Sequence, residues 1–261
     1  MVHLFSAWQE VFTKLKSAEH VILLSDFDGT LAPIVARPGL AKLSERTKRL
    51  LQELVHRRRY TVGIISGRAL GDLKDRVGLK GIVYAGNYGM EIESLWFSFV
   101  TPAAEESKPL LHSLCQELSL ALGAIKGVIV ENKGLSFSVH YRQVVESQSD
   151  QVRSIVGQVT RTARMRGEIQ ITSGKKVYEV RPAIDWDKGK VIDLLFRKKR
   201  EEKEKVLPLF LGDDLSDEDG FKAVDKYGGI AIFIGEGGGQ SEAHYFLRSA
   251  DEVDEFLERL P

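Results

Sequence analysis

Residues 21–30 read Val-Ile-Leu-Leu-Ser-Asp-Phe-Asp-Gly-Thr, and this stretch decides the fold. A continuous apolar run that leads at once into carboxylates is typical of a strand that is buried on both faces, as in parallel sheets. Asp26 and Asp28, two residues apart, can face the same side of an extended chain, and Gly29 permits a tight turn after them. The stretch therefore predicts a buried parallel strand that ends in two acids.

The same pattern recurs along the chain. Residues 42–58 carry leucines at helical spacing and separate the first strand from the next apolar run. This alternation of strand, helix and strand predicts right-handed crossovers in a doubly wound, Rossmann-like α/β fold with a parallel sheet. The further apolar runs, each followed by small or polar residues, are 61–65, 82–84, 207–211 and 230–234.

The middle of the chain, from about residue 90 to 180, has a different pattern. In residues 135–142 apolar and polar side chains alternate, which predicts a strand with one packed face and one open face. Residues 168–180 predict a hairpin, and helical stretches are expected near 105–123 and 147–166. These elements indicate a separate, smaller α/β domain inserted into the parallel one.

The chain has 261 residues, which is enough for two domains of ordinary size. We predict a catalytic core at 1–103 and 182–261, with the inserted domain at 104–181. The 37 Lys and Arg residues balance 37 Asp and Glu residues, which argues against nucleic acid as a partner but not against a small anionic substrate.

The chain carries no sequence signal for export or for a membrane. Residues 1–20 mix Glu and Lys with apolar residues, which favours an amphipathic helix over a signal peptide, and no apolar run approaches the ~20 residues that cross a bilayer. The single cysteine, Cys115, lies in an apolar-periodic stretch and is expected in the core. We therefore expect a cytoplasmic, monomeric protein without a membrane partner.

A second acidic cluster follows the apolar run at 207–211. Residues 212–219 read Gly-Asp-Asp-Leu-Ser-Asp-Glu-Asp, and helix capping alone does not require so many acids. Carboxylate oxygens are the ligands that Mg²⁺ prefers, and such sites leave positions for a phosphate. Together, the two acidic clusters predict a Mg²⁺ site.

Other predicted strand ends and helix starts supply groups that suit a phosphate. Ser66 offers a hydroxyl beside Gly67, and Lys188 opens a helical run whose amino terminus favours anions. Asp26 would attack phosphorus to give an aspartyl-phosphate, and Ser66 and Lys188 would neutralise the phosphoryl charge. Asp28 would protonate the leaving alkoxide and later take a proton from the attacking water.

These residues fall into motifs with a known counterpart. In order, they match the four motifs of the haloacid dehalogenase phosphatase superfamily: DFDGT at 26–30, SGR at 66–68, WDKGK at 186–190 and GDDLSDED at 212–219. More narrowly, the chain resembles the trehalose-6-phosphate phosphatase family over nearly its whole length. The more specific segments are ENKG at 131–134, HYR at 140–142 and EVRP at 179–182, which correspond to the cap domain that contacts the sugar.

The resemblance implies a Mg²⁺-dependent hydrolysis of trehalose 6-phosphate, with a role for each matching residue. Asp26 would be the nucleophile and Asp28 the acid and base, while Ser66 and Lys188 would bind the phosphoryl group. Asp26, the backbone carbonyl of Asp28, and Asp213 would hold the metal, with Asp214 in support. The candidates for the disaccharide and for cap closure are Arg68, Glu131, Lys133, Arg142 and Glu179. Salt bridging on the surface or between domains is the alternative role of these last five.

One position departs from the family. Residues 86–91 resemble its GxHGxE pattern, but Tyr88 stands where the family has histidine. The alternatives on substrate and reaction are a phosphatase of another glycosyl phosphate, such as sucrose phosphate or glucosylglycerol phosphate, a sugar phosphomutase, and a silent sugar-phosphate sensor. The presence of both a nucleophile and an adjacent acid argues against the sensor.

Overall fold

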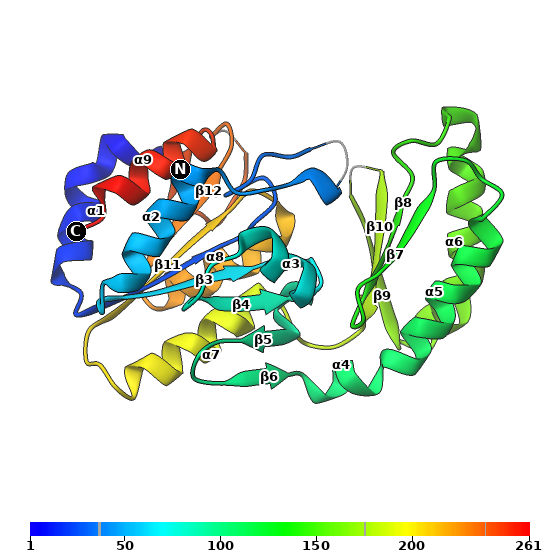
Figure 1. The fold of residues 1–261 in the computed structure, drawn as a ribbon, viewed down its shortest axis with the longest axis horizontal. Coiled ribbons are helices and arrows are strands. Elements are labelled where there is room, and N and C mark those ends of the chain that lie inside the picture. The colour runs from blue at the N-terminus through cyan, green and yellow to red at the C-terminus, as the bar shows by residue number, and fades with distance from the viewer. Residues whose placement is uncertain (36–37, 175, 238) are drawn as a thin grey trace. The chain divides into compact units, whose positions relative to one another are not determined.

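Two separate sheets organise the chain in the computed structural model, which describes residues 1–35, 38–174, 176–237 and 239–261. The larger unit comprises Met1–Phe99 and Trp186–Pro261, and the smaller comprises Val100–Asp185. The smaller unit, green in Figure 1, is therefore an insertion in the sequence of the larger one. Its predicted role as a cap stays a prediction.

The larger unit is built on a nine-stranded sheet in the order β1-β13-β12-β11-β2-β3-β4-β5-β6. Neighbours from β1 to β4 are parallel, and β5 runs antiparallel to β4. The strands are β1 Val2–His3, β2 His20–Ser25, β3 Tyr60–Ile65, β4 Val83–Gly86, β5 Glu91–Glu93, β6 Ser98–Val100, β11 Val206–Gly212, β12 Ile230–Ile234 and β13 Tyr245–Leu247. The predicted mainly parallel α/β core is thus confirmed.

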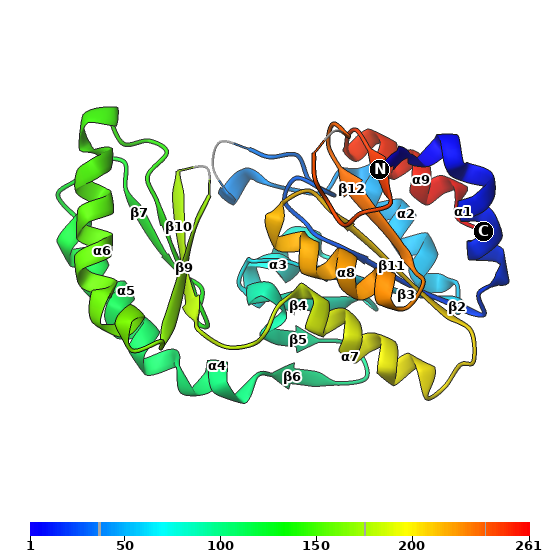
Figure 2. The ribbon, with the colours of Figure 1, turned by 180° about the vertical axis from the view of Figure 1, so that it is seen from behind.

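Strand β2 is buried on both faces because helices cover both sides of the sheet. Val21 and Leu23 enter one apolar cluster, whereas Ile22 and Leu24 enter another on the opposite face. The first cluster includes helices α1 Trp8–Ser17, α2 Glu45–His56, α3 Leu70–Val77 and α9 Ala250–Arg259, and the second includes α7 Lys188–Arg200 and α8 Glu218–Lys226. Figures 1 and 2 show the two groups of helices on opposite sides of the sheet.

The smaller unit holds an antiparallel sheet in the order β7-β8-β10-β9. Its strands are β7 Ile129–Asn132, β8 Phe137–His140, β9 Ile169–Gly174 and β10 Val177–Pro182, and its helices are α4 Pro102–Glu106, α5 Lys108–Leu122 and α6 Ser149–Met165. One face of the sheet packs on α5 and α6 through Phe137, Val139 and Val180. Cys115 is buried in this cluster, and the predicted hairpin is the pair β9–β10.

The strand predicted at 135–142 is shorter in the structure. Strand β8 ends at His140, because the chain turns where the amide of Val144 donates to the carbonyl of Tyr141 at 3.1 Å. Arg142 is therefore exposed in a turn. The alternation at 135–142 predicts that Arg142 and His140 share the open face of one strand, and this prediction is wrong because the strand ends at His140. Ser136 and Ser138, expected on an open face, are buried, and the hydroxyl of Ser138 donates to Glu179 at 2.8 Å.

Among the described residues, no helix combines the length and the apolar character that crossing a bilayer requires.

Candidate active site

The predicted catalytic residues of the larger unit lie where its central parallel strands end. Asp26 follows β2, Ser66 follows β3, Asp213 follows β11, and Lys188 is the first residue of α7. The amide of Asp26 donates to the carbonyl of Leu211 at 2.8 Å, which ties the ends of β2 and β11 together. Ligands of open α/β sheets bind at such carboxyl ends.

A buried ion network links the segment after β2, the loop after β11 and the start of helix α7. Lys188 Nζ lies 2.6 Å from Asp26 Oδ1 and 2.6 Å from Asp217 Oδ1. The exposed fractions of the three residues are 2 % for Lys188, 6 % for Asp26 and 0 % for Asp217. Buried charges are stable only when they are paired and hydrogen-bonded, so this network fixes the three side chains relative to one another.

Burial and charge act on this network in opposite directions. Burial lowers the pKa of Lys188, but the charges of Asp217 and Asp26 outweigh it and raise that pKa well above its ordinary value. Burial raises the pKa of Asp26; Lys188 opposes this shift, and the charges of Asp217 and Asp213 add to it. Lys188 is therefore a permanent cation amid an excess of carboxylates.

Asp217 shapes the loop after β11. Its Oδ2 accepts hydrogen bonds from the amides of Asp213 at 3.0 Å and Asp214 at 3.1 Å, while its Oδ1 contacts Lys188. A Cβ atom on Gly212 would lie 2.3 Å from Cγ of Asp217, so only glycine leaves room for this carboxylate. Asp217 was not among the predicted site residues, although it lies within the acidic motif at 212–219.

The carboxylates at this position fit a divalent metal ion. Oxygen atoms of Asp26, Asp213 and Asp217 lie within 4.8 Å of one another. Burial, together with Asp217 and Asp214, raises the pKa of Asp213 to about 7, as expected of acids that lack a matching cation. Hard carboxylate oxygens of this kind suit Mg²⁺ and related cations. The predicted ligand of Asp28 is its backbone carbonyl, and its side chain is not part of this cluster.

Gly29 allows the two acidic segments to approach each other. Its φ is +92°, and a Cβ atom there would lie 2.1 Å from Oδ2 of Asp213. The hydroxyl of the next residue, Thr30, donates to Oδ1 of Asp213 at 3.2 Å. Thr30 belongs to the DFDGT motif, but the sequence alone did not reveal its contact with Asp213.

Asp28 is held by Arg68 rather than by the metal cluster. Arg68 Nε lies 2.6 Å from Asp28 Oδ2, and Arg68 Nη2 lies 2.6 Å from Asp28 Oδ1. Two parallel bonds of this kind are the strongest geometry for a guanidinium and a carboxylate. The structure thus places Arg68, a predicted sugar contact, beside the predicted acid.

Ser66 lies in a tight corner made with Tyr88. Ser66 is buried, its Oγ accepts from the amide of Arg68 at 3.2 Å, and its carbonyl accepts from the amide of Tyr88 at 2.8 Å. A Cβ atom on Gly67 would lie 2.7 Å from the ring of Tyr88. Tyr88 has a φ of +61°, in the left-handed region, so this backbone is strained at the position where the family has histidine.

In the smaller unit, three predicted sugar contacts and His140 lie on the face of the sheet that α5 and α6 do not cover. Lys133 Nζ lies 3.0 Å from Glu179 Oε2, and His140 Nε2 lies 2.8 Å from Glu131 Oε2. Glu131 pairs in register with Ser138, and Ser138 pairs with Glu179, so the three side chains form a row across the strands. Larger polar side chains on this face include Glu131, Lys133, His140 and Glu179, and we call these four residues the polar row.

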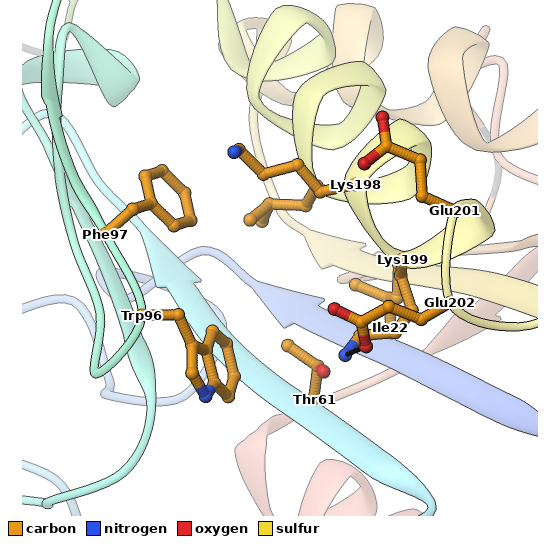
Figure 3. A pocket seen from close by; sticks show the side chains of 9 residues that line it. Ile22, Thr61, Trp96, Phe97, Lys198, Lys199, Glu201 and Glu202 are labelled. Atoms are coloured by element: carbon orange, nitrogen blue, oxygen red, sulfur yellow. Dashed lines mark hydrogen bonds and ion pairs between the residues drawn. The ribbon is translucent and has the colours of Figure 1, made fainter.

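A cavity of about 260 Å³ lies elsewhere in the larger unit, near the amino-terminal halves of β2 and β3 (Figure 3). Trp96, Phe97 and Lys198 line it, and its Lys199 pairs with Glu202 at 2.7 Å. None of the predicted site residues lines this cavity. The candidate site is therefore the opposite, carboxyl end of the strands.

The chain is similar in sequence to known proteins. A family model described as trehalose-phosphatase matches residues 24–251. A trehalose-phosphate phosphatase of Mycobacterium tuberculosis (strain ATCC 25618 / H37Rv) is 37% identical over 240 residues, which is 90% of this chain and 60% of the relative. The chain thus spans less than two thirds of that protein.

Two solved structures resemble the fold. The C-terminal domain of Candida albicans trehalose-6-phosphate phosphatase has a TM-score of 0.82 at 23% identity and covers 97% of this chain and 95% of its own. A haloacid dehalogenase-like hydrolase from Bacteroides thetaiotaomicron has a TM-score of 0.63 at 16% identity, over 93% of this chain and 100% of its own. At these identities the likeness establishes the fold.

Proposed function

Because this chain belongs to the trehalose-phosphatase family, we propose that it hydrolyses trehalose 6-phosphate to trehalose and inorganic phosphate. The observation that carries the proposal is the buried network of Asp26, Lys188 and Asp217 at the strand ends, within the segment that the family model matches. Such a network supplies a carboxylate nucleophile beside a fixed cation, which phosphoryl transfer requires.

Asp26 acts as the nucleophile in the first step. One of its carboxylate oxygens bonds to phosphorus as the bond between phosphorus and the sugar oxygen breaks, which leaves a phosphoryl group on Asp26. Asp28 donates its proton to the departing sugar oxygen, so the sugar leaves as an alcohol. Lys188 and the hydroxyl of Ser66 stabilise the charge on the phosphoryl oxygens.

The second step reverses the role of Asp28. Its carboxylate takes a proton from water as the water oxygen bonds to phosphorus. The bond between phosphorus and Asp26 then breaks, which releases inorganic phosphate and restores both aspartates. Lys188 stays bound to Asp217 throughout and keeps Asp26 in place between the two steps.

We propose Mg²⁺ as the metal, held by Asp26, the backbone carbonyl of Asp28, and Asp213. The close carboxylates of Asp26, Asp213 and Asp217 support a cation here. When bound, Mg²⁺ offsets negative charge on the phosphoryl group and on the carboxylates. Asp217 keeps the loop of Asp213 in place through two backbone hydrogen bonds, and Asp214 supports that loop as the helix cap.

The inserted domain, predicted at 104–181, recognises the sugar as a cap. Glu131, Lys133, Arg142 and Glu179 present carboxylates and cations, which bind sugar hydroxyls well and give orientation to a ligand. The uncovered face that carries the polar row supports this role. A cap that closes over the bound substrate also excludes bulk water.

The test is phosphate release from a panel of sugar phosphates, with and without EDTA. We expect trehalose 6-phosphate to be hydrolysed faster than glucose 6-phosphate, sucrose phosphate or glucosylglycerol phosphate, and chelation to abolish the activity. Full activity after thorough chelation contradicts the metal. Equal rates on trehalose 6-phosphate and glucose 6-phosphate contradict the substrate but leave the reaction class intact.

A further inference from the structure

The ion pair between Asp28 and Arg68 is the first part of a longer chain of charges. Arg68 Nη1 donates to Asp72 Oδ2 at 2.8 Å, so one guanidinium contacts two carboxylates. Asp72 also accepts from Arg76, through Nε and Nη2 at 2.7 Å each. Acids and bases therefore alternate from Asp28 through Arg68 and Asp72 to Arg76.

The outer end of this chain is fixed to the backbone. Arg76 Nη1 donates to the carbonyls of Gly39 at 2.9 Å and Ala41 at 3.2 Å. Asp72 and Arg76 both belong to α3, one turn apart, so their pair is held by the helix as well. Asp72 is thus a rigid anion, whereas Asp28 lies in the turn after β2.

The burial of Arg68 restricts how Asp28 can move. The side chain of Arg68 is 8 % exposed, and a guanidinium buried to that extent needs a paired anion at all times. With both oxygens of Asp28 bound to Arg68, neither is available to the leaving oxygen of a substrate. Arg68 has to give up one of these bonds while it keeps a carboxylate partner.

We propose that Asp72 is a positioning residue for the reaction: it retains the guanidinium of Arg68 when Asp28 turns one oxygen towards the leaving sugar oxygen. This inference rests on the proposed function, because that function makes Asp28 the acid. Asp72 touches neither the reacting atoms nor the metal cluster, and acts only through Arg68. Without its charge, Arg68 loses the carboxylate that competes with Asp28 for the guanidinium, and it holds Asp28 more firmly.

The test compares two leaving groups in the variant Asp72→Asn. A sugar alkoxide needs a proton to leave, whereas p-nitrophenolate leaves without one. We expect Asp72→Asn to lower kcat/KM for trehalose 6-phosphate about 10-fold and to leave kcat/KM for p-nitrophenyl phosphate within about twofold. The ratio kcat/KM covers only the steps up to departure of the leaving group, before Asp28 acts as the base in the second step. Asp75→Asn, an exposed position on the same helix, is the matched control and should leave both rates unchanged.

Asp72→Glu keeps the charge and moves it by one methylene. Its ratio of kcat/KM for trehalose 6-phosphate to kcat/KM for p-nitrophenyl phosphate should therefore lie between those of wild type and Asp72→Asn. If Asp72→Asn does not fold, this variant decides: a ratio at least about twofold below wild type supports the proposal, and an unchanged ratio overturns it. Equal losses on both substrates, as from a purely structural role, also overturn it.

The same assay separates this inference from the proposed function. A wild-type chain that hydrolyses neither compound, or only the aryl phosphate, refutes the function and the inference together. A wild-type chain active on both, with an unchanged ratio in Asp72→Asn, refutes only the role of Asp72.

Discussion

The larger and the smaller unit use the same kinds of side chain under different exposure. At the strand ends of the larger unit, Lys188 is almost fully buried between Asp26 and Asp217. On the polar row of the smaller unit, Lys133 and Glu179 keep only 7 % and 15 % of their side chains exposed, whereas Glu131 and His140 keep 35 % and 20 %. Deep burial fixes positions and perturbs pKa values, whereas partial exposure leaves groups accessible to a ligand. In the proposed function, the buried network carries out the chemical step and the more exposed groups recognise the sugar.

The largest expected effect comes from the buried network. Asp26→Asn should lower kcat by at least ~10³-fold, because an amide cannot form the acyl-phosphate bond. The shape of the side chain is retained, so circular dichroism and the melting temperature should stay close to wild type. Substantial turnover in this variant, measured as phosphate release, would remove the nucleophile's role from Asp26.

A variant on the polar row should act mainly on KM. Lys133→Ala removes the buried partner that fixes the carboxylate of Glu179, so we expect KM for trehalose 6-phosphate to rise about 10-fold. Its kcat on p-nitrophenyl phosphate, which has no sugar, should stay within about twofold. A fall in kcat on both compounds without a change in KM would contradict the proposal that the larger unit carries out the chemistry and the smaller unit binds the sugar.

Metal binding should compete with a proton at Asp213. Because burial and neighbouring carboxylates raise the pKa of Asp213 to about 7 from 3.8, the native chain binds a proton up to about pH 7 that the unfolded chain loses near pH 4. The metal-free protein should therefore lose stability as pH rises through this window.

Thermal melts with and without Mg²⁺ check this expectation. The increase in melting temperature with Mg²⁺ should be larger at about pH 8 than at about pH 5.5, and each kcal/mol corresponds to roughly 2–4 °C in a chain of this size. Asp213→Asn should remove most of the increase. Equal increases at both pH values would show that the ion does not displace that proton.

The smallest effect is expected from an exposed pair. Lys176 Nζ lies 2.6 Å from Glu146 Oε2, but the two side chains are 38 % and 83 % exposed. Lys176→Gln should therefore change the free energy of unfolding by less than about 1 kcal/mol, measured by denaturant titration, and leave catalysis unaffected. A larger loss would contradict the expectation that an exposed ion pair contributes little to stability.

The sequence predicts the core of the fold well because its pattern is strong there. Long apolar runs such as 207–211 correspond to central strands, and the polar groups after them meet at one edge of the sheet. The short strands β1, β5, β6 and β13 escaped the prediction because they have only two or three residues, too few for a periodic pattern.

The candidate site was predictable in its members but not in their pairing. Spacing placed Asp26 and Asp28 on one side of the chain, but the structure directs them to Lys188 and to Arg68 respectively. Asp217 was overlooked because its partner Lys188 lies 29 residues away in the sequence, whereas its bonds to backbone amides of its own loop are typical of a helix cap. Long-range partners such as these depend on the tertiary fold, which no local pattern encodes.

The discontinuous larger unit also has a consequence for synthesis on the ribosome. Strand β2 lies between β3 and β11, yet β11 and Asp217 follow the whole smaller unit in the sequence. At about 5–20 residues per second, Asp217 is made roughly 10–40 s after Asp26. During that interval one edge of β2 lacks its partner strand, so its backbone N–H and C=O groups on that side stay unpaired until translation has passed β11.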